Sequence, residues 1–291
     1  MKTLLTRFEG IAWILLASAS FAAMGAFTKA AVAGVGVADA VFWRSVVVML
    51  VALGLSWRQG VSLRPGNLRL MLWRSGIGLV AMGLFFWSIG QIELGLAHTL
   101  LYTSPLFMAL LSGRMLGEGG GWRTLLPAGV AFGGVVLLVQ PSAGQLELGT
   151  FAALGAGFLA ALAYITVRRL RTTDPPARVV WFFAAFSAAA TAPFALYDGV
   201  PTDPDQLALL LAVGVFAAGG QLAMTRAYAV EQATIVGPFS NVTVIFSFLL
   251  GLLIWDESLG LGGTIGMVLV VLACAALGRT AGGAAPPTRP G

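Results

Sequence analysis

The sequence predicts an all-α membrane protein with ten transmembrane helices in two inverted five-helix repeats, and with both termini in the cytoplasm. Three observations support this fold class. Of the 291 residues, 58% are hydrophobic and only 10% are charged, whereas about a quarter of the residues of a soluble domain carry a charge. The chain divides into apolar runs that are each long enough to cross about 30 Å of hydrocarbon at 1.5 Å per residue. The two halves of the chain also resemble each other at a fixed offset.

Clusters of glycine, proline and polar residues separate the apolar runs. Two of these clusters are RPGN at residues 64–67 and DPP at residues 174–176, and such residues favour turns. We expect helices over residues 10–33, 38–57, 69–90, 95–117, 121–140, 147–170, 177–197, 206–228, 233–255 and 259–278.

The distribution of basic residues predicts the orientation in the membrane. Cytoplasmic loops carry an excess of Lys and Arg. If the N-terminus lies inside, every Lys and Arg except Lys29 and Arg44 falls on the inner side. An even number of helices then returns the C-terminus to the cytoplasm.

An internal repeat divides the chain into residues 1–139 and 140–278, followed by a Gly- and Pro-rich tail, 279–291, that we expect to be a disordered cytoplasmic segment. Glu118 ends the fourth run, and Glu257 ends the ninth run 139 residues later. Because five helices are an odd number, the second repeat must be inserted upside down. Inverted repeats are typical of transporters, since they give one bundle two arrangements that open to opposite sides.

Two stretches carry a resemblance to a known family. Residues 97–105 run on to Glu118, and their counterpart 236–241 runs on to Glu257. This pattern, over nearly the whole chain, resembles the EamA branch of the drug/metabolite transporter (DMT) superfamily, and is most similar to ten-helix bacterial exporters of amino acids, including aromatic ones. The resemblance implies a multi-pass protein of the bacterial inner membrane. It also implies a central cavity lined by the first, third, fourth, sixth, eighth and ninth helices.

Polar side chains inside the predicted spans are the candidates for a cargo site, because such groups are expensive in a bilayer. On the fourth run, His98 and Tyr102 share one helix face. On the ninth run, Asn241 is the repeat equivalent of Tyr102, and Ser240 adjoins it. We expect Tyr102 and Asn241 to meet near the midplane and bind a carboxylate or an amine. The alternative is a hydrogen bond between helices that does not touch cargo.

Two prolines are candidates for gating. Pro105 lies on the same face of the fourth run as Tyr102 and matches the proline of the family's fourth helix. The repeat equivalent of Pro105 is Val244, and Pro238 lies six residues earlier, so the two halves need not bend alike. A static kink is the alternative to gating.

Four further residues are weaker candidates for the cargo site. Gln221 lies well inside the eighth run and is expected to face the lumen. Trp87 and Tyr164 are positioned to stack on an aromatic or apolar cargo, with a lipid or packing role as the alternative. His98 lies a few residues from the outer end of its run, where it either binds cargo, shuttles protons or simply occupies the interface.

Charged residues at the ends of runs complete the predictions. Lys29 and Arg44 lie near the outer ends of the first two runs, where they either snorkel to headgroups or attract an anionic group at the outer mouth. Glu118 and Glu257 are expected to hold loops rather than cargo. Close packing, or alternatively a dimer contact, is expected from two glycine pairs in the fifth and tenth runs, Gly129 with Gly133 and Gly262 with Gly266.

The composition excludes several classes of protein. The chain has one Cys and one His, so we expect no metal, no cofactor and no enzyme. It has no P-loop for ATP hydrolysis. No Asp or Glu lies near the centre of a predicted span, whereas proton antiporters usually bury one.

We therefore expect a secondary transporter that exports amino acids, including aromatic and apolar ones, by alternating access, either facilitative or with a coupling that the sequence hides. Export of a nucleobase, a nucleotide sugar or a cationic drug remains an alternative, as does the more distant class of intramembrane enzymes. The expected partners are a small-molecule substrate and the lipid bilayer, with no nucleic acid, and the expected state is a monomer or a weak homodimer.

Overall fold

A computed structural model describes residues 2–104, 106–108, 110–111, 122–139, 147–195, 197, 199, 201–230 and 237–282 of the chain. Within these residues every regular element is a helix. In chain order the helices are α1 (Lys2–Val32), α2 (Val37–Arg58), α3 (Leu68–Ile89), α4 (Leu94–Leu101), α6 (Trp122–Val139), α7 (Leu148–Leu170), α8 (Pro176–Ala195), α9 (Pro204–Val230), the 3₁₀ helix η1 (Gly237–Asn241), α11 (Val242–Trp255) and α12 (Leu261–Gly282). The all-helical prediction is thereby confirmed for the described part of the chain.

Within the described part of the chain, six helices are long and apolar enough to cross a membrane. Their apolar stretches lie in α1, α2, α3, α7, α8 and α9, and shorter apolar helices cover Phe239–Trp255 and Leu261–Ala273. These elements coincide with predicted runs, although the count of ten transmembrane helices stays a prediction. The predicted tail beyond Gly282 lies outside the described residues.

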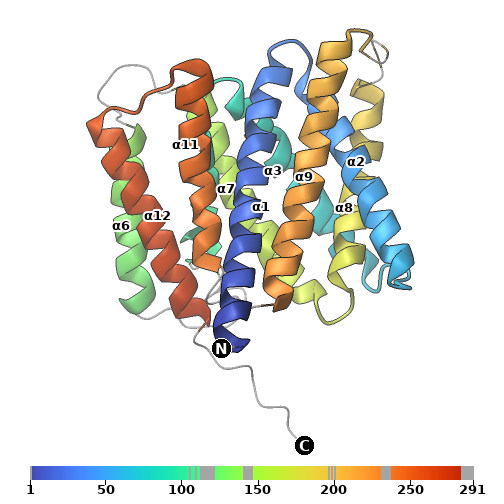
Figure 1. Cartoon of the computed structure of the whole chain (residues 1–291), viewed down its shortest axis with the longest axis horizontal. Coiled ribbons are helices and arrows are strands. Elements are labelled where there is room, and N and C mark those ends of the chain that lie inside the picture. The colour runs from blue at the N-terminus through green and yellow to red at the C-terminus, as the bar shows by residue number, and fades with distance from the viewer. Residues whose placement is uncertain are drawn as a thin grey trace, which may run out of the picture.

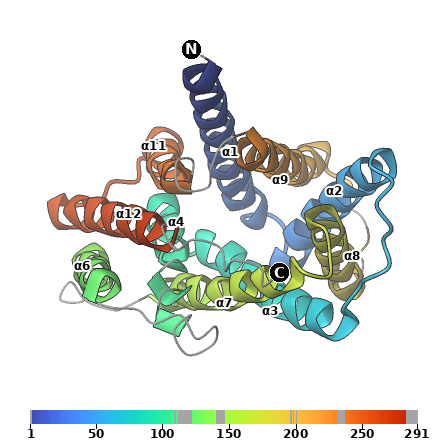
Figure 2. The ribbon, with the colours of Figure 1, turned by 90° about the horizontal axis from the view of Figure 1, so that it is seen from below.

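The helices form one bundle in which pairs pack side by side. α1 packs against α9, α2 against α8, α3 against α7, and α6 against α12. Viewed along the bundle in Figure 2, α6 and α12 stand at one edge, α2 and α8 stand near the opposite edge, and α1, α4, α7 and α11 lie between them. α1 begins and α12 ends at the lower end of the bundle in Figure 1. Their location in the cytoplasm stays a prediction.

The packing of α6 against α12 depends on a glycine that the sequence patterns did not single out. A Cβ added to Gly134 would lie 2.9 Å from the Gly266 carbonyl oxygen, so a larger residue would force the two helices apart. By contrast, a Cβ added to Gly129 or Gly133 would meet no described neighbour within 4 Å, and both glycines are exposed. Gly129 and Gly133 therefore lie on another face of α6 and do not make the α6–α12 contact, while the alternative of a dimer contact stays a prediction.

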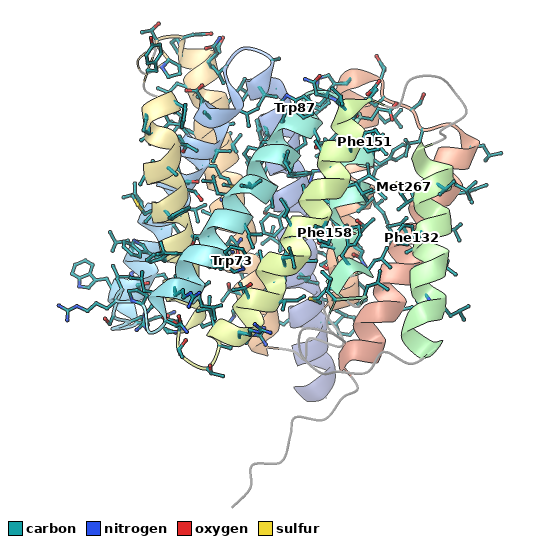
Figure 3. The ribbon with its side chains drawn as sticks, turned by 180° about the vertical axis from the view of Figure 1, so that it is seen from behind. Trp73, Trp87, Phe132, Phe151, Phe158 and Met267 are labelled. Carbon is teal, nitrogen blue, oxygen red and sulfur yellow. The ribbon has the colours of Figure 1, made fainter. Side chains whose placement is uncertain are left out.

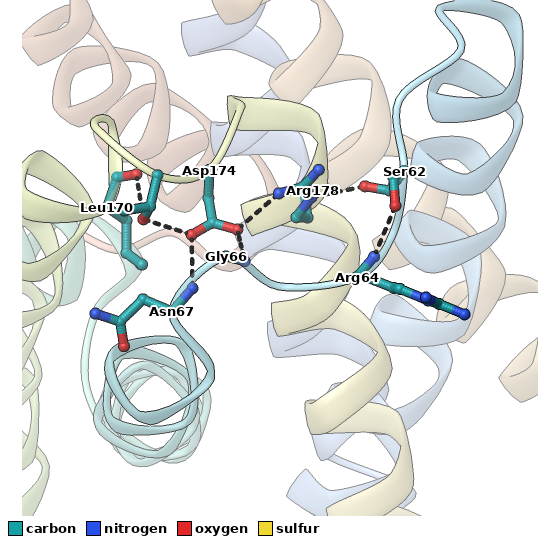
Figure 4. A network of polar contacts seen from close by, with 8 residues as sticks. Ser62, Arg64, Gly66, Asn67, Leu170, Asp174 and Arg178 are labelled. Atoms are coloured by element: carbon teal, nitrogen blue, oxygen red, sulfur yellow. Dashed lines mark hydrogen bonds and ion pairs between the residues drawn. The ribbon is translucent and has the colours of Figure 1, made fainter.

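A buried carboxylate joins the α2–α3 connection to the α7–α8 connection (Figure 4). Asp174 accepts hydrogen bonds from the Gly66 amide at 2.7 Å, the Thr173 hydroxyl at 2.7 Å and the Arg178 guanidinium at 3.1 Å. Arg178 also donates to the Ser62 carbonyl oxygen at 2.6 Å. Burial raises the pKa of Asp174, but these donors outweigh burial and hold the pKa below its usual range. Asp174 therefore acts as a clamp between two loops.

Candidate functional site

The fourth apolar run is interrupted near its middle. α4 ends at Leu101, and Tyr102 and Thr103 form a turn before helical residues resume. The Thr103 amide and hydroxyl both donate to the Leu100 carbonyl oxygen, at 3.2 and 2.6 Å. The sequence explains the break, because Pro105 has no N–H to offer the Leu101 carbonyl four residues earlier. The prediction of a continuous helix over 95–117 is therefore wrong.

Helix α7 comes very close to this interruption. A Cβ added to Gly157 would lie 2.7 Å from the Leu100 carbonyl oxygen and 3.2 Å from the Leu101 carbonyl oxygen. Only glycine permits this distance between α7 and α4. Gly157 is thus part of the site, although the sequence patterns did not single it out.

The ninth run changes helix type at the equivalent place. The 3₁₀ helix η1 passes directly into α11 at Asn241, and residues 231–236 lie outside the described residues. Asn241 lies 139 residues after Tyr102, which is the offset of the predicted repeat. Both halves of the chain therefore depart from regular α-helix at the same repeat position, by a turn at Tyr102 and by a 3₁₀ helix that ends at Asn241.

Helix α1 contacts the second interruption with a serine. The Ser18 hydroxyl donates to the carbonyl oxygens of Phe239 and Ser240, both at 3.4 Å. Ser18 lies 139 residues before Gly157. Ser18 and Gly157 thus occupy equivalent positions in the two repeats. Ser18 places a hydroxyl against η1 of the second half, and Gly157 places a glycine against the turn after α4 of the first half.

The two interruptions meet at the contact between α4 and α11. The Tyr102 hydroxyl donates to the Thr243 hydroxyl oxygen at 3.0 Å, and the Thr243 hydroxyl donates to the Ser240 carbonyl oxygen at 2.8 Å. Asn241 is buried, with 5% of its surface exposed. The predicted residues Tyr102, Ser240 and Asn241 thus lie in one region, and Thr243 is the partner that Tyr102 meets. Cargo binding by these residues stays a prediction.

His98 is enclosed by protein and not exposed at an interface. Its ring packs edge-on against Phe85 with the centroids 4.9 Å apart, and its Nδ1 lies 3.2 Å from the Leu94 carbonyl oxygen. A Cβ added to Gly25 would clash with the His98 ring, so α1 makes room for this side chain. These contacts pack α1, α3 and α4 together.

Gln221 lines a cavity of about 180 Å³ between α2, α8 and α9. Most of the lining is aliphatic, and Gln59 and Thr225 are the other polar side chains. This cavity lies beside α2 and α8, near one edge of the bundle, so a position of Gln221 in a central lumen and its contact with cargo both stay predictions.

Arg44 and Arg74 form a second polar cluster in the bundle. Arg44, on α2, is 7% exposed, so it does not extend to the headgroups as one of the two alternatives proposed. The guanidinium carbons of Arg74 and Arg44 lie 3.9 and 6.0 Å from the centroid of the Phe183 ring on α8. Tyr164, on α7, lies within electrostatic reach of both arginines and is 54% exposed. The structure thereby joins two predicted site residues, Arg44 and Tyr164, with Arg74, which the sequence patterns did not single out.

Lys29 lies in a different environment at the upper end of α1. It forms an ion pair with Glu257, donates to the Ile92 carbonyl oxygen at 2.7 Å, and lies 5.7 Å from the centroid of the Trp255 ring. The other carboxylate oxygen of Glu257 accepts a hydrogen bond from the Leu94 amide at 2.7 Å. Glu257 therefore ties the start of α4 to the end of α11, which is the kind of role that was predicted for it.

The remaining predicted site residues are placed less informatively. Trp87 is 37% exposed near the end of α3 (Figure 3). Pro238 lies in η1. Pro105 and Glu118 lie outside the described residues. No group of three or more potential metal ligands occurs within the described part of the chain.

The profile of the EamA-like transporter family matches residues 8–140 and, a second time, residues 147–279. The chain therefore belongs to the EamA-like transporter family, a family of multi-pass membrane proteins.

Known transporters resemble this chain along most of its length. The pseudopaline exporter CntI of Pseudomonas aeruginosa is 32% identical over 278 residues, which cover 94% of this chain and 96% of the exporter. The riboflavin transporter of Vibrio cholerae is 28% identical, with 85% of each chain covered. Solute carrier family 35 member G1 of Mus musculus is 26% identical, with 85% of this chain and 72% of the carrier covered. A solved crystal structure shares the fold with a TM-score of 0.66 at 18% identity, over 93% of this chain and 95% of the other.

Proposed function

We propose that the chain is a secondary transporter that exports small metabolites, in the first place amino acids including aromatic ones, across the bacterial inner membrane by alternating access. The observation that carries the proposal is the pair of helix irregularities at matching repeat positions, the turn at Tyr102 and the 3₁₀ helix that ends at Asn241. Transporter sites near the bilayer midplane are typically built from irregular helices, one from each inverted repeat.

The packing of the bundle supports the division into two repeats. In the two repeats, the equivalent helices are α1 and α7, α2 and α8, α3 and α9, α4 and α11, and α6 and α12. When each helix is exchanged for its equivalent, the α1–α9 contact corresponds to the α3–α7 contact, and the α1–α11 contact corresponds to the α4–α7 contact. The two separate matches to the family profile, residues 8–140 and 147–279, also support it. An approximate two-fold of this kind provides two equivalent arrangements of one bundle, as alternating access requires.

The relatives support a small organic cargo and the direction of transport. One is described as a pseudopaline exporter and another as a riboflavin transporter. Both are bacterial, which supports the inner membrane as the location. For this chain, the Tyr102–Thr243 contact supplies hydroxyl groups beside the interruptions, and Phe27 and Phe216 stack with centroids 5.1 Å apart between α1 and α9. Hydroxyl groups and aromatic rings suit an amino acid with an aromatic side chain.

Efflux from preloaded proteoliposomes tests the proposal. The purified full chain is reconstituted, and loss of the labelled L-amino acids, riboflavin and a nucleobase is followed against protein-free vesicles. We expect efflux of at least one amino acid, and we expect Tyr102→Phe to slow that efflux several-fold. Tyr197→Phe is the matched control, because Tyr197 is 86% exposed and lies away from the interruptions. Absence of efflux for the whole panel would contradict transport of such metabolites, and equal rates for the two tyrosine variants would contradict the site.

A further inference from the structure

Two arginines lie inside the bundle without a counter-charge. The Nε and Nη1 atoms of both Arg44 and Arg74 are buried and have no hydrogen-bond partner among the residues that the structure describes. Neither arginine takes part in an ion pair with any acidic residue that the structure describes. A buried cation without a partner is strongly unfavourable, and an ionisable group within a membrane span is by default a candidate functional group.

The two guanidinium groups gather near the middle of the bundle. Arg44 lies seven residues after the start of α2, and Arg74 lies six residues after the start of α3. At 1.5 Å per residue, each backbone position is about 10 Å from the start of its own helix, and the two helices start at opposite ends of the bundle. A Cβ added to Gly78 would lie 3.2 Å from Arg74 Nη1 and 3.0 Å from the Phe183 ring. Gly78 therefore makes room on α3 for the stacked pair of Arg74 and Phe183, at about half the length of that helix.

The surroundings suit an anion rather than an acidic side chain. Arg74 stacks on Phe183, which leaves the edge of the guanidinium, with its N–H donors, available for planar recognition. Tyr164 offers a hydroxyl from α7 within electrostatic reach of both arginines. Arginine binds carboxylates through two parallel N–H···O bonds, and such charge-assisted bonds are about twice as strong as neutral ones.

We propose that Arg44 and Arg74 form the site that binds the carboxylate of the cargo, so that the transporter selects metabolites carrying a carboxylate over their neutral analogues. The claim that the bound carboxylate belongs to the cargo rests on the proposed transport function. The claim that the two arginines bind an anion does not depend on it. The cargo carboxylate supplies the negative charge that the two arginines lack. Arg74 and Arg44 hold it, and Tyr164 completes the hydrogen bonds.

Binding to the detergent-purified full chain tests the anion site separately from transport. Thermal stability is measured with benzoate, with benzamide as the neutral analogue of the same shape, and with inorganic phosphate. We expect benzoate to raise the melting temperature and benzamide to leave it unchanged. We expect Arg44→Gln and Arg74→Gln each to weaken benzoate binding about tenfold, the loss of one charge-assisted interaction. An equal response to benzamide would overturn the site, and a response to phosphate alone would overturn its assignment to carboxylates.

Matched controls keep the test interpretable. Arg58→Gln on α2 and Arg69→Gln on α3 remove an exposed arginine from the same two helices, and we expect both to bind benzoate like the wild type. Should either glutamine variant of the buried arginines fail to fold, Arg44→Lys and Arg74→Lys retain the charge but lose the planar fork. We expect these lysine variants to bind benzoate more weakly, and wild-type binding by both would overturn the proposal.

Efflux of L-phenylalanine and L-phenylalaninamide then separates the two proposals. We expect efflux of the amino acid to exceed that of the amide, and to fall about tenfold in Arg44→Gln and Arg74→Gln. Efflux of the amide at the rate of the amino acid, or unchanged efflux in both variants, would overturn the anion site and leave the transport function standing. Absence of efflux for every probe, together with benzoate binding, would contradict the transport function and leave the anion site standing.

Discussion

Two regions of the bundle hold cations that are buried or partly buried, one with an acidic partner and one without any among the described residues. At the upper end of α1, one lysine, Lys29, has Glu257 as its ion-pair partner and Glu93 in electrostatic reach. In the middle of the bundle, Arg44 and Arg74 lie together over one phenylalanine ring with no acidic partner among the described residues. A balanced charge stabilises the structure, whereas an unbalanced one lowers stability and creates a place for a mobile anion. The difference separates a structural contact from a candidate binding contact.

Removal of the acid from the balanced region is expected to have the largest effect. Glu257→Gln leaves Lys29 partly buried without its counter-charge, and we expect a loss of about 2 kcal/mol of stability. Thermal or denaturant unfolding in detergent measures it. Lys29→Met combined with Glu257→Gln provides the control, because removal of both charges should recover part of the loss. An unaffected single variant would show that the ion pair does not stabilise this end.

The Asp174 clamp extends the comparison to a balanced charge at the loops. Asp174→Asn weakens several donors at once, and we expect a loss of about 1.5 kcal/mol at neutral pH. Because the pKa of Asp174 in the folded protein lies below the ordinary value of 3.8, its contribution is complete above about pH 4 and is lost as the pH falls through the folded-state pKa. The difference between wild type and variant should therefore shrink in acid, and a difference that grows in acid would contradict the clamp.

Removal of a cation from the unbalanced region should change stability in the opposite direction. Arg44→Gln eliminates a buried charge that lacks a partner, and we expect stability in the absence of ligand to rise by about 1 kcal/mol. The same unfolding assay measures it, with Arg58→Gln as the control on the same helix. A gain of stability together with weaker anion binding is the signature of a binding group. A loss as large as that of Glu257→Gln would mean that Arg44 has a structural partner.

The smallest effect is expected at Glu93, in the connection between α3 and α4. Burial raises the pKa of Glu93, and the Glu257 carboxylate raises it further, while Lys29 opposes them. Glu93→Gln should therefore stabilise the protein at pH 7, by less than about 0.5 kcal/mol because the side chain is partly exposed. The gain should vanish as the pH falls through the raised pKa toward 4.5, since the wild-type carboxyl then becomes protonated. Unfolding at pH 7 and pH 5 measures the difference.

The sequence predicted the elements better than the interruptions within them. The apolar runs matched helices because length and hydropathy report directly on membrane crossing. Pro105 was recognised, yet a continuous helix was still predicted, because a proline inside an apolar run predicts either a kink or a break. In the ninth run, Pro238 was named as a gating candidate, and the structure places it in the 3₁₀ helix η1 that precedes α11.

The site was predicted in part for a similar reason. Tyr102 and Asn241 were paired from the repeat, and both lie at the contact of α4 with α11. Ser18 was passed over, because a serine in an apolar helix usually bonds to its own backbone, as Ser20 does with the Leu16 carbonyl oxygen at 2.8 Å. The carbonyl oxygens that Ser18 meets belong to the 3₁₀ helix η1 of the opposite half.

The composition by itself indicated that this chain lies in a membrane, and the charge pattern predicted that most of its basic residues share one side. Hydropathy and the positive-inside bias depend only on the order of residue types along the chain, so both can be obtained from the sequence without the three-dimensional structure. Tertiary structure alone decided which cations are balanced. Lys29 and Glu257 are distant in sequence, and Arg44 and Arg74 start from opposite ends of the bundle. Whether a charge is paired depends on side-chain direction across packed helices, which no pattern along the chain contains.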